Sequence, residues 1–150
     1  MLQRVLNSVE CIVIHHSVTP DDYTVQDLRL IHLNRHYSDI GYHYVVAKDD
    51  NDKWRAFPGR PLKYSGAHCI ADKTGEDMNN TSLGVCIVGT YTYRDPPPDA
   101  INECAYIVKR LCKKVKIPVN RDHIIGHSDV SYTVCPGKNT MSLLYKKLEI

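Results

Sequence analysis

The sequence lacks a long apolar segment and lacks an excess of charge of either sign. Apolar runs such as Cys11–Ile14 are far shorter than the roughly 20 residues of a membrane-spanning helix. The 19 basic and 17 acidic residues leave a net charge of +2, which does not support a nucleic-acid binder that depends on a broad basic field. The sequence therefore predicts neither a membrane segment nor a nucleic-acid partner.

No export signal is expected either, because Gln3, Arg4 and Asn7 interrupt the N-terminal apolar residues. We therefore expect the chain to accumulate in the cytoplasm. Internal repeats, low-complexity tracts and linker-like stretches are also missing, and 150 residues suit one compact unit. With 43% hydrophobic and 24% charged residues, the composition is that of a globular protein, so we expect a single domain over residues 1–150.

The six cysteines do not suggest a disulfide framework, although an even count is typical of short secreted chains that have one. Four of them lie in strand-like or helical apolar patterns, where a thiol behaves as a small hydrophobic group: Cys11, Cys86, Cys104 and Cys112. Cys104 and Cys112 would lie about 12 Å apart along a helix, too far for a disulfide. Cys69 and Cys135 stand in polar segments, which makes them the candidates for a chemical role.

Hydrophobic patterns predict strands that alternate with helices. The expected strands are 10–15, 42–47, 54–57 and 83–88, with a short extended segment at 123–126. Helices are expected after a Thr24 cap paired with Asp27, after an Asp99 cap that follows three prolines, and over 140–148. Residues 58–81 are expected to form a long loop. This order predicts an α/β domain with a central mixed β-sheet flanked by helices.

Two of the eight histidines stand where strands are expected to end. His15 ends the first strand, His127 follows the extended segment, and Cys135 comes eight residues later. Ligands of open α/β sheets bind beyond strand ends, and two imidazoles with one thiolate would hold Zn²⁺ with a fourth position open for catalysis. Spacing alone leaves scattered structural histidines and a buried thiol as the alternative. The other histidines considered structural or exposed are His32, His36, His43 and His123.

Seven short motifs identify a family by their order along the chain. They are Ile12–Ser17, Gly41–Tyr44, Gly59–Pro61, Gly66–His68, Ser82–Val85, Gly126–His127 and Cys135–Gly137. In this order the chain resembles the zinc-dependent N-acetylmuramoyl-L-alanine amidases of type 2, which include small phage lysozymes that act as amidases and the peptidoglycan-recognition proteins. The resemblance runs from about residue 10 to the C-terminus.

The resemblance implies a metal site and two groups that assist catalysis. His15, the first histidine of the His15–His16 pair, corresponds to the first zinc ligand, and His127 and Cys135 correspond to the second and third. Strand alternation turns His16 to the other face, which supports a single ligand from this pair. Tyr42 corresponds to a tyrosine whose hydroxyl approaches the reacting water and carbonyl group. Thr133 stands where relatives have a lysine or threonine, and its hydroxyl would donate a hydrogen bond to an oxyanion.

The resemblance also implies substrate-binding residues: Arg60, His68, Asn79 and Asn80. For His68 the alternative is a surface loop histidine, and for the asparagines it is simple turn formation. Cys86 departs from the bacterial recycling amidases, which have a glutamate there as general base. The base is therefore left open between Tyr42 and direct activation of water by the metal.

The implied function is zinc-dependent hydrolysis of the amide bond between N-acetylmuramic acid and L-alanine in peptidoglycan, as by a phage endolysin. Such a protein would act as a monomer on peptidoglycan or muropeptides and would reach the wall from the host cytoplasm through a separate pore-forming protein. The alternative is a non-catalytic muropeptide-binding module, and an additional role as a protein partner, such as inhibition of a phage RNA polymerase, is left open. Cys135 and Tyr42 together favour the enzyme, because relatives without amidase activity typically lack the cysteine.

Overall fold

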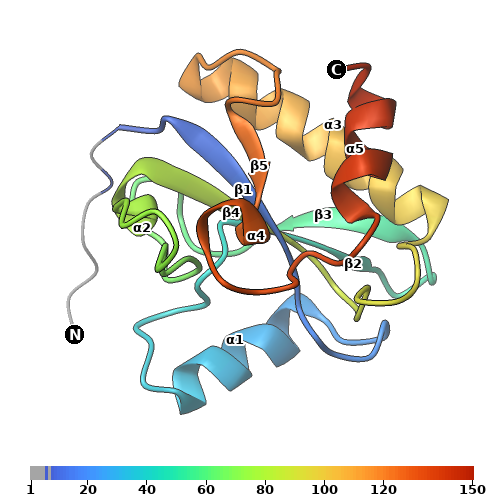
Figure 1. Cartoon of the computed structure of the whole chain (residues 1–150). Helices are drawn as coiled ribbons and strands as arrows, with labels where there is room; N and C mark the ends of the chain where they lie inside the picture. The colour runs from blue at the N-terminus through green and yellow to red at the C-terminus, as the bar shows by residue number, and fades with distance from the viewer. Residues whose placement is uncertain (1–5, 7) are drawn as a thin grey trace.

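The computed structural model describes residue 6 and residues 8–150 and, within them, a five-stranded mixed sheet with helices on both faces (Figure 1). The strands are β1 (Cys11–His16), β2 (Tyr44–Lys48), β3 (Trp54–Pro58), β4 (Ser82–Ile87) and β5 (Ile124–Gly126). The helices are α1 (Val25–Asn34), α2 (Met78–Thr81), α3 (Pro98–Val115), α4 (His127–Val130) and α5 (Thr140–Leu148). This architecture confirms the predicted fold class.

The strand order β3-β2-β4-β1-β5 places β1 in the interior of the sheet. β1 runs parallel to both β4 and β5, β2 runs parallel to β4, and β3 is antiparallel to β2. All residues of β1 and β4 are buried, as expected for parallel strands that are covered on both faces. The carboxyl ends of β1, β4 and β5 therefore meet at one edge of the sheet.

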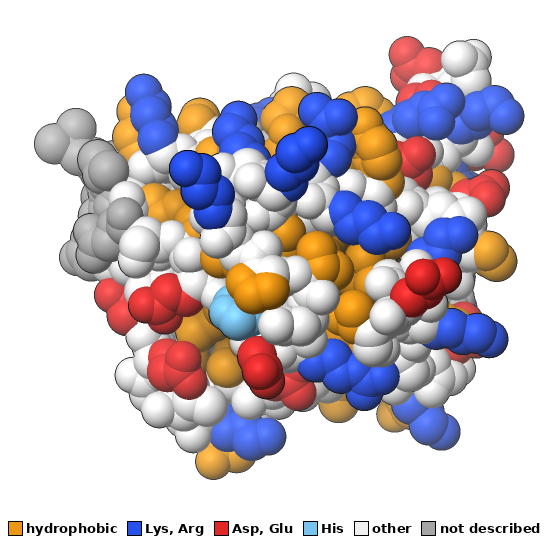
Figure 2. Space-filling view, turned by 90° about the horizontal axis from the view of Figure 1, so that it is seen from above, with side chains coloured by type: hydrophobic (Ala, Val, Ile, Leu, Met, Phe, Trp, Pro, Cys, Tyr) orange, Lys and Arg blue, Asp and Glu red, His pale blue; other side chains and the backbone are white. Residues whose placement is uncertain are grey.

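Helices α3 and α5 cover one face of the sheet, and α1 lies on the other (Figure 1). The apolar stripe predicted for α3 is confirmed, since eight of its residues are buried, including Ile101, Val108 and Leu111. Its exposed residues near the C-terminal end are cationic: Lys109, Arg110, Lys113 and Lys114. Viewed from above, the molecule shows lysine and arginine side chains spread over this face (Figure 2). The helix thus buries one side in the core and exposes a charged side to solvent.

The capping signal at α1 was predicted correctly, and the one at α3 was wrong. Thr24 Oγ1 accepts a hydrogen bond from the Asp27 N–H at 3.2 Å, and Asp27 Oδ2 accepts one from the Thr24 N–H at 2.7 Å. In α3, by contrast, Pro97 is the N-cap and Pro98 is already helical, so Asp99 lies inside the first turn. Proline suits this position because the first helical residues need no N–H donor.

Two single-turn helices and one strand boundary also differ from expectation. Helix α2 lies at the end of the predicted loop 58–81, and α4 directly follows β5. Four residues are too few to display a helical period, so these turns left no signal in the sequence. Tyr42 lies outside β2, which begins at Tyr44 rather than at the predicted residue 42.

The expectation that the cysteines do not form a disulfide framework is confirmed, because all six cysteines are free and buried. None of the helices in residue 6 and residues 8–150 is both long and apolar enough to cross a bilayer. The interrupted N-terminal segment of Gln3, Arg4 and Asn7, on which the expected lack of an export signal rests, lies outside the described residues.

Arg60 acts as an internal clamp, and its role in substrate binding stays a prediction. The side chain is 5% exposed, and its three guanidinium nitrogens donate to backbone carbonyls. Nε bonds Ile40 O at 2.9 Å, Nη1 bonds Ser65 O at 2.7 Å and Nη2 bonds Asp39 O at 3.1 Å. Through these three hydrogen bonds, Arg60 ties the segment before β2 to the loop after β3.

We therefore expect Arg60→Met to lower the free energy of unfolding by about 2–4 kcal/mol, because charge-assisted hydrogen bonds are lost and buried carbonyls are left without donors. Urea unfolding followed by circular dichroism measures this loss. Arg55→Met is the matched control, since Arg55 is half exposed and its ion pairs with Asp49 and Glu103 are 3.5 and 3.7 Å long. Its loss should cost less than about 1 kcal/mol. Equal effects of the two substitutions would contradict the clamp.

Candidate metal centre

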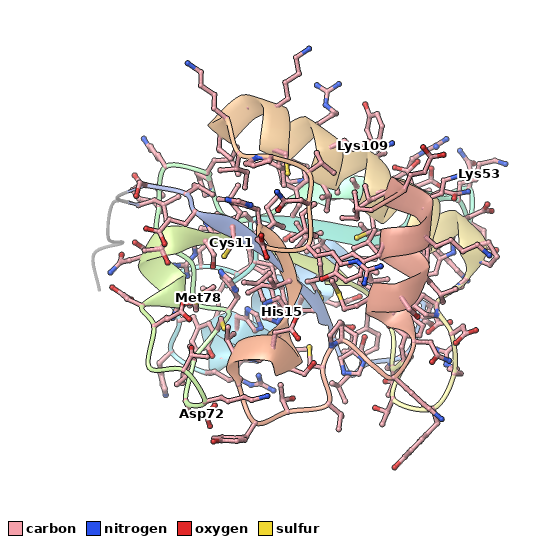
Figure 3. All side chains as sticks on the ribbon, turned by 45° about the horizontal axis from the view of Figure 1, so that its top comes forward. Cys11, His15, Lys53, Asp72, Met78 and Lys109 are labelled. Carbon is pink, nitrogen blue, oxygen red and sulfur yellow. The ribbon has the colours of Figure 1, made fainter. Side chains whose placement is uncertain are left out.

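Three side chains that can ligate a metal converge at the carboxyl edge of the sheet. His15 lies near the end of β1, His127 is the first residue of α4, and Cys135 lies in the loop that follows α4. Their ligand atoms all lie within 4.8 Å of one another. The structure thus brings together the three residues that the sequence proposed as a ligand set. In Figure 3, His15 lies near the middle of the view, whereas Lys53 and Lys109 lie at the periphery.

Local structure explains why these residues meet. β1 and β5 are parallel neighbours, with Ile14 opposite Gly126, so the residues that follow, His15 in β1 and His127 in α4, lie side by side. Asp129 Oδ2 accepts a hydrogen bond from the Gly126 N–H at 2.8 Å and fixes the start of α4. The Ser128 N–H then donates to the Cys135 carbonyl at 2.9 Å, which holds the cysteine loop against the same turn.

The spacing of His15 and Cys135 suits a tetrahedral metal ion. His15 Nδ1 lies 3.8 Å from Cys135 Sγ. Zinc bonds of about 2.0–2.3 Å in a tetrahedral arrangement separate neighbouring ligand atoms by roughly 3.3–3.8 Å. His15 and Cys135 are 1% and 7% exposed, whereas His127 is only half-buried. The donor set therefore opens to solvent on the side of His127.

Burial keeps the candidate ligands uncharged. Desolvation, followed by the neighbouring His68 and His127, holds the pKa of His15 well below its usual value, and desolvation also lowers the pKa of His127. Neutral imidazoles carry the lone pair that a metal needs. Burial raises the pKa of Cys135 to about 12, against the opposing effect of the His16 N–H, which donates to Sγ at 3.3 Å. A metal would therefore displace the thiol proton as it binds.

His68 lies against the candidate ligands and also lines the two cavities beside them. His15 Nε2 and His68 Nδ1 are 2.9 Å apart, and His68 is 8% exposed. Desolvation lowers the pKa of His68 to about 3, so this ring is neutral too. Metal-binding histidines usually hydrogen-bond through the nitrogen that does not face the metal, and the pair of His15 and His68 has that arrangement.

A cleft of two adjoining cavities, about 530 and 520 Å³ in volume, opens beside the three residues. The residues that line both cavities are His32, Arg35, Tyr42, His68, His127 and Thr133. The first cavity extends along the loop from Ala67 to Asp72, and the second along Ser17–Pro20 and the inner side of α1. The candidate metal centre thus lies where two arms of one cleft join.

Tyr42 and Thr133 both reach this junction, as the sequence proposed. The ring centroids of Tyr42 and His15 are 5.2 Å apart. Burial raises the pKa of Tyr42 well above its usual value, so its hydroxyl keeps its proton and acts as a hydrogen-bond donor. Thr133 is exposed to the cleft, and its Oγ1 accepts the Cys135 N–H at 3.2 Å. This bond uses only the oxygen, so the hydroxyl proton of Thr133 stays available to a ligand.

The two asparagines hold loops in place. Asn79 Oδ1 accepts hydrogen bonds from the N–H groups of His68 and Cys69 at 2.9 and 3.0 Å, although Asn79 also lines the first cavity. Asn80 donates to Asp77 Oδ2 at 2.8 Å and accepts a hydrogen bond from the Ser65 hydroxyl. The contact with substrate predicted for these residues stays a prediction, and their observed role is to support the loop that carries His68.

Sequence reasoning missed several residues of the cleft. His32 was considered structural or exposed, yet it lines both cavities while its Nδ1 accepts the Gly41 N–H at 2.8 Å. Arg35, the C-cap of α1, brings a cation to both cavities. Asp72 and Tyr132 line the first cavity. Only the helical spacing of His32 and Arg35, one turn apart at the end of α1, could have suggested that they face the same space.

Cys86 is unsuited to act as a base. It lies beside His15 in the register of β4 and β1 and is 0% exposed. Burial raises the pKa of its thiol well above the usual value, and the thiol donates to the Ile87 carbonyl at 3.8 Å. A protonated thiol in this position fills space and contacts Tyr42 without accepting a proton from water.

Comparison with known proteins gives a consistent result. The endolysin of Klebsiella phage KP32 is 26% identical over 128 residues, which cover 83% of this chain and 78% of the phage protein. A peptidoglycan-recognition protein of Drosophila simulans is 23% identical over 152 residues, covering 97% of this chain and 78% of that protein. The structure of the endolysin N-acetylmuramoyl-L-alanine amidase LysCS from Clostridium intestinale matches with a TM-score of 0.82 and 25% identity, over 100% of this chain and 90% of that one.

A family model described as N-acetylmuramoyl-L-alanine amidase matches residues 6–138. This range contains the sheet, the cleft and all three candidate ligands. The match covers most of the 150 residues, and the fold agrees with that of a solved amidase. The chain belongs to the N-acetylmuramoyl-L-alanine amidase family.

Proposed function

We propose that this protein is a zinc-dependent amidase that hydrolyses the bond between N-acetylmuramic acid and L-alanine in peptidoglycan. The observation that carries the proposal is the convergence of His15, His127 and Cys135, whose ligand atoms lie within 4.8 Å of one another at the junction of a cleft. Nitrogen and sulfur ligands are typical of zinc, and three protein ligands leave one position for chemistry. Membership of the amidase family supports the choice of bond.

The chain supplies two ligands in the protonation state that metal binding needs, and the third would lose its proton to the metal. An ion held here would supply Lewis acidity, which activates water as a nucleophile and polarises the scissile carbonyl group. His15 and His127 would bind as neutral imidazoles, and Cys135 would bind as a thiolate that the His16 N–H stabilises at 3.3 Å. One anionic ligand leaves the centre with a net positive charge, which favours the negative charge that develops on the carbonyl oxygen.

Tyr42 and Thr133 provide hydrogen bonds at the reacting group. The raised pKa of Tyr42, caused by burial, keeps its hydroxyl protonated, so Tyr42 donates to the oxygen on which charge develops. Thr133 is exposed in the cleft beside Cys135 and donates from the other side without adding positive charge. Cys86 remains a neutral neighbour of Tyr42 and supplies no base, so an ion held by His15, His127 and Cys135 would supply the activation of water.

The shape of the cleft suits a substrate with two arms. The scissile amide joins a sugar to a peptide, and the two cavities of about 530 and 520 Å³ meet at the candidate metal centre. Arg35 and His32 line both cavities, where they can bind carbonyl or carboxylate groups on either side of the cut. The relative from a Klebsiella phage is an endolysin, which supports a role in lysis of the cell wall.

The decisive experiment combines metal analysis with product analysis. We expect the purified protein to contain about one zinc per chain and to release stem peptides with new L-alanine amino termini from purified peptidoglycan, as identified by mass spectrometry. Glycan strands should stay intact. Binding of muropeptide without cleavage, by zinc-loaded protein, would instead favour the recognition role that the name of the Drosophila relative indicates.

Removal of the thiolate should abolish both metal binding and activity. We expect Cys135→Ala to lose stoichiometric zinc and to release stem peptides at no more than about 0.1% of the wild-type rate, because two neutral imidazoles hold zinc weakly and the metal supplies most of the catalysis. Cys104→Ala is the matched control, since Cys104 is equally buried but lies in α3. Full activity of zinc-free Cys135→Ala protein would contradict the proposed mechanism.

Tyr42 should affect the rate without affecting the metal. We expect Tyr42→Phe to keep its zinc and to lose about 100-fold in kcat, because one hydrogen bond to a developing oxyanion is worth about 3 kcal/mol. Zinc content and steady-state kinetics on a soluble muropeptide measure the two effects. Tyr44→Phe is the control, because Tyr44 lies in β2 next to Leu111 and Lys113 of α3, away from the cleft. An unchanged kcat in Tyr42→Phe would exclude the donor role.

A further inference from the structure

We propose that His68 is a positioning residue that fixes the proton of His15 on Nε2 and so presents Nδ1 to the metal. The inference rests on the proposed zinc-dependent function, because it assigns His68 a role toward the zinc ligand rather than toward the substrate. Its basis is a directed chain of hydrogen bonds that starts in the backbone of α2 and ends at His15. Each link determines where the next proton lies.

The chain begins at Ser82, the first residue of β4. Its hydroxyl donates to the Met78 carbonyl at 2.5 Å, which uses the only polar hydrogen of the side chain. The Ser82 carbonyl oxygen and Oγ each lie 3.4 Å from His68 Nε2. Both oxygens therefore present lone pairs to this nitrogen, and the hydrogen between them must be carried by His68 Nε2.

The proton on His68 Nε2 determines the roles in the next link. A neutral imidazole with Nε2–H has a bare Nδ1, which can only accept. His15 Nε2, at 2.9 Å from His68 Nδ1, must then be the donor. His15 Nδ1 is left with its lone pair at 3.8 Å from Cys135 Sγ, on the side where the ligand atoms converge. The opposite tautomer would place an N–H where the metal should bind.

Neighbouring residues constrain the position of the His68 ring as well as the position of its proton. A Cβ atom at Gly66 would lie 2.3 Å from His68 Cδ2, and one at Gly84 would lie 2.6 Å from His68 Cγ. Any larger residue at either position would collide with the ring. The backbone of His68 is held from a third side by Asn79 Oδ1 at 2.9 Å. The fold thus leaves a space of the size of one imidazole, next to the candidate ligand.

The test compares two substitutions at this position. His68→Leu fills the space but accepts no hydrogen bond, whereas the Oδ1 atom of His68→Asn replaces the acceptor at Nδ1. Loss of such a partner typically weakens metal binding by roughly 10–100-fold, so we expect a loss of that size for the leucine variant and a change of at most about threefold for the asparagine variant. Competition with a chromophoric chelator measures zinc affinity. His43→Leu is the control for loss of a buried histidine, since His43 bonds Gly84 and Tyr64 but not His15.

The tautomers can be read directly in the wild-type protein, whether or not a variant folds. Long-range ¹⁵N–¹H spectra of histidine-labelled protein should show the proton on Nε2 of both His15 and His68, with and without zinc. In folded His68→Leu without zinc, His15 should become a mixture of tautomers. A proton on Nδ1 of either wild-type histidine, or a leucine variant that binds zinc as tightly as the wild type, would overturn the positioning role. Failure of the wild type to bind zinc would instead contradict the proposed function.

Discussion

The site depends on the parallel pairing of β1 with β4 on one side and β5 on the other. Parallel strands end at the same edge of a sheet, so the ends of β1 and β5, which are far apart in the sequence, bring His15 and His127 to one place. His15 and His127 become neighbours with ring centroids 4.6 Å apart, and the turn after β5 then brings Cys135 back to them. A register shift of one residue between β1 and β5 would turn His15 to the opposite face and separate the ligand set.

The site also requires that its buried polar groups have hydrogen-bond partners and that these partners determine which atom carries each proton. Among the described residues, every buried side-chain nitrogen and oxygen has a hydrogen-bond partner. Burial alone would make the imidazoles neutral, but it would not decide which nitrogen carries the proton. Backbone carbonyls make that decision, because they can only accept: the Met78 carbonyl acts through Ser82 on His68, and His68 acts on His15. Hydrogen bonds from α2 and β4 thereby act on the tautomer of His15, which lies in β1.

The parts of this structure that were predictable from the sequence are those with local or periodic causes. The capping box at Thr24, the stripe of α3 and the buried run of β1 follow from spacing along the chain, and strand ends pointed to His15 and His127. The contacts of the segment between β3 and β4 were not predictable from the sequence, because Arg60 and Asn79 bind backbone atoms of segments that come near only in the folded chain. The same holds for His68, whose partners His15 and Ser82 lie in two different strands. The sequence motifs assigned these residues to the site. They did not indicate that Asn79 holds the backbone of His68 or that His68 in turn contacts His15.

The environment of Tyr42 shows how the chain works without a carboxylate base. A carboxylate at position 86 would be an anion beside the Tyr42 hydroxyl and could take a proton from water. Cys86 is instead a buried thiol. Desolvation raises the pKa of both the Cys86 thiol and the Tyr42 hydroxyl, so both stay protonated at neutral pH and neither can accept a proton. The Cys86 thiol donates to the Ile87 carbonyl at 3.8 Å, so the proton of the Tyr42 hydroxyl stays available to a ligand. In the proposed mechanism neither side chain would act as a base, and a thiolate of Cys135, held by the His16 N–H, would be the only anion in the ligand set. A single anionic ligand keeps the centre electrophilic, which is the property that an unreactive amide requires.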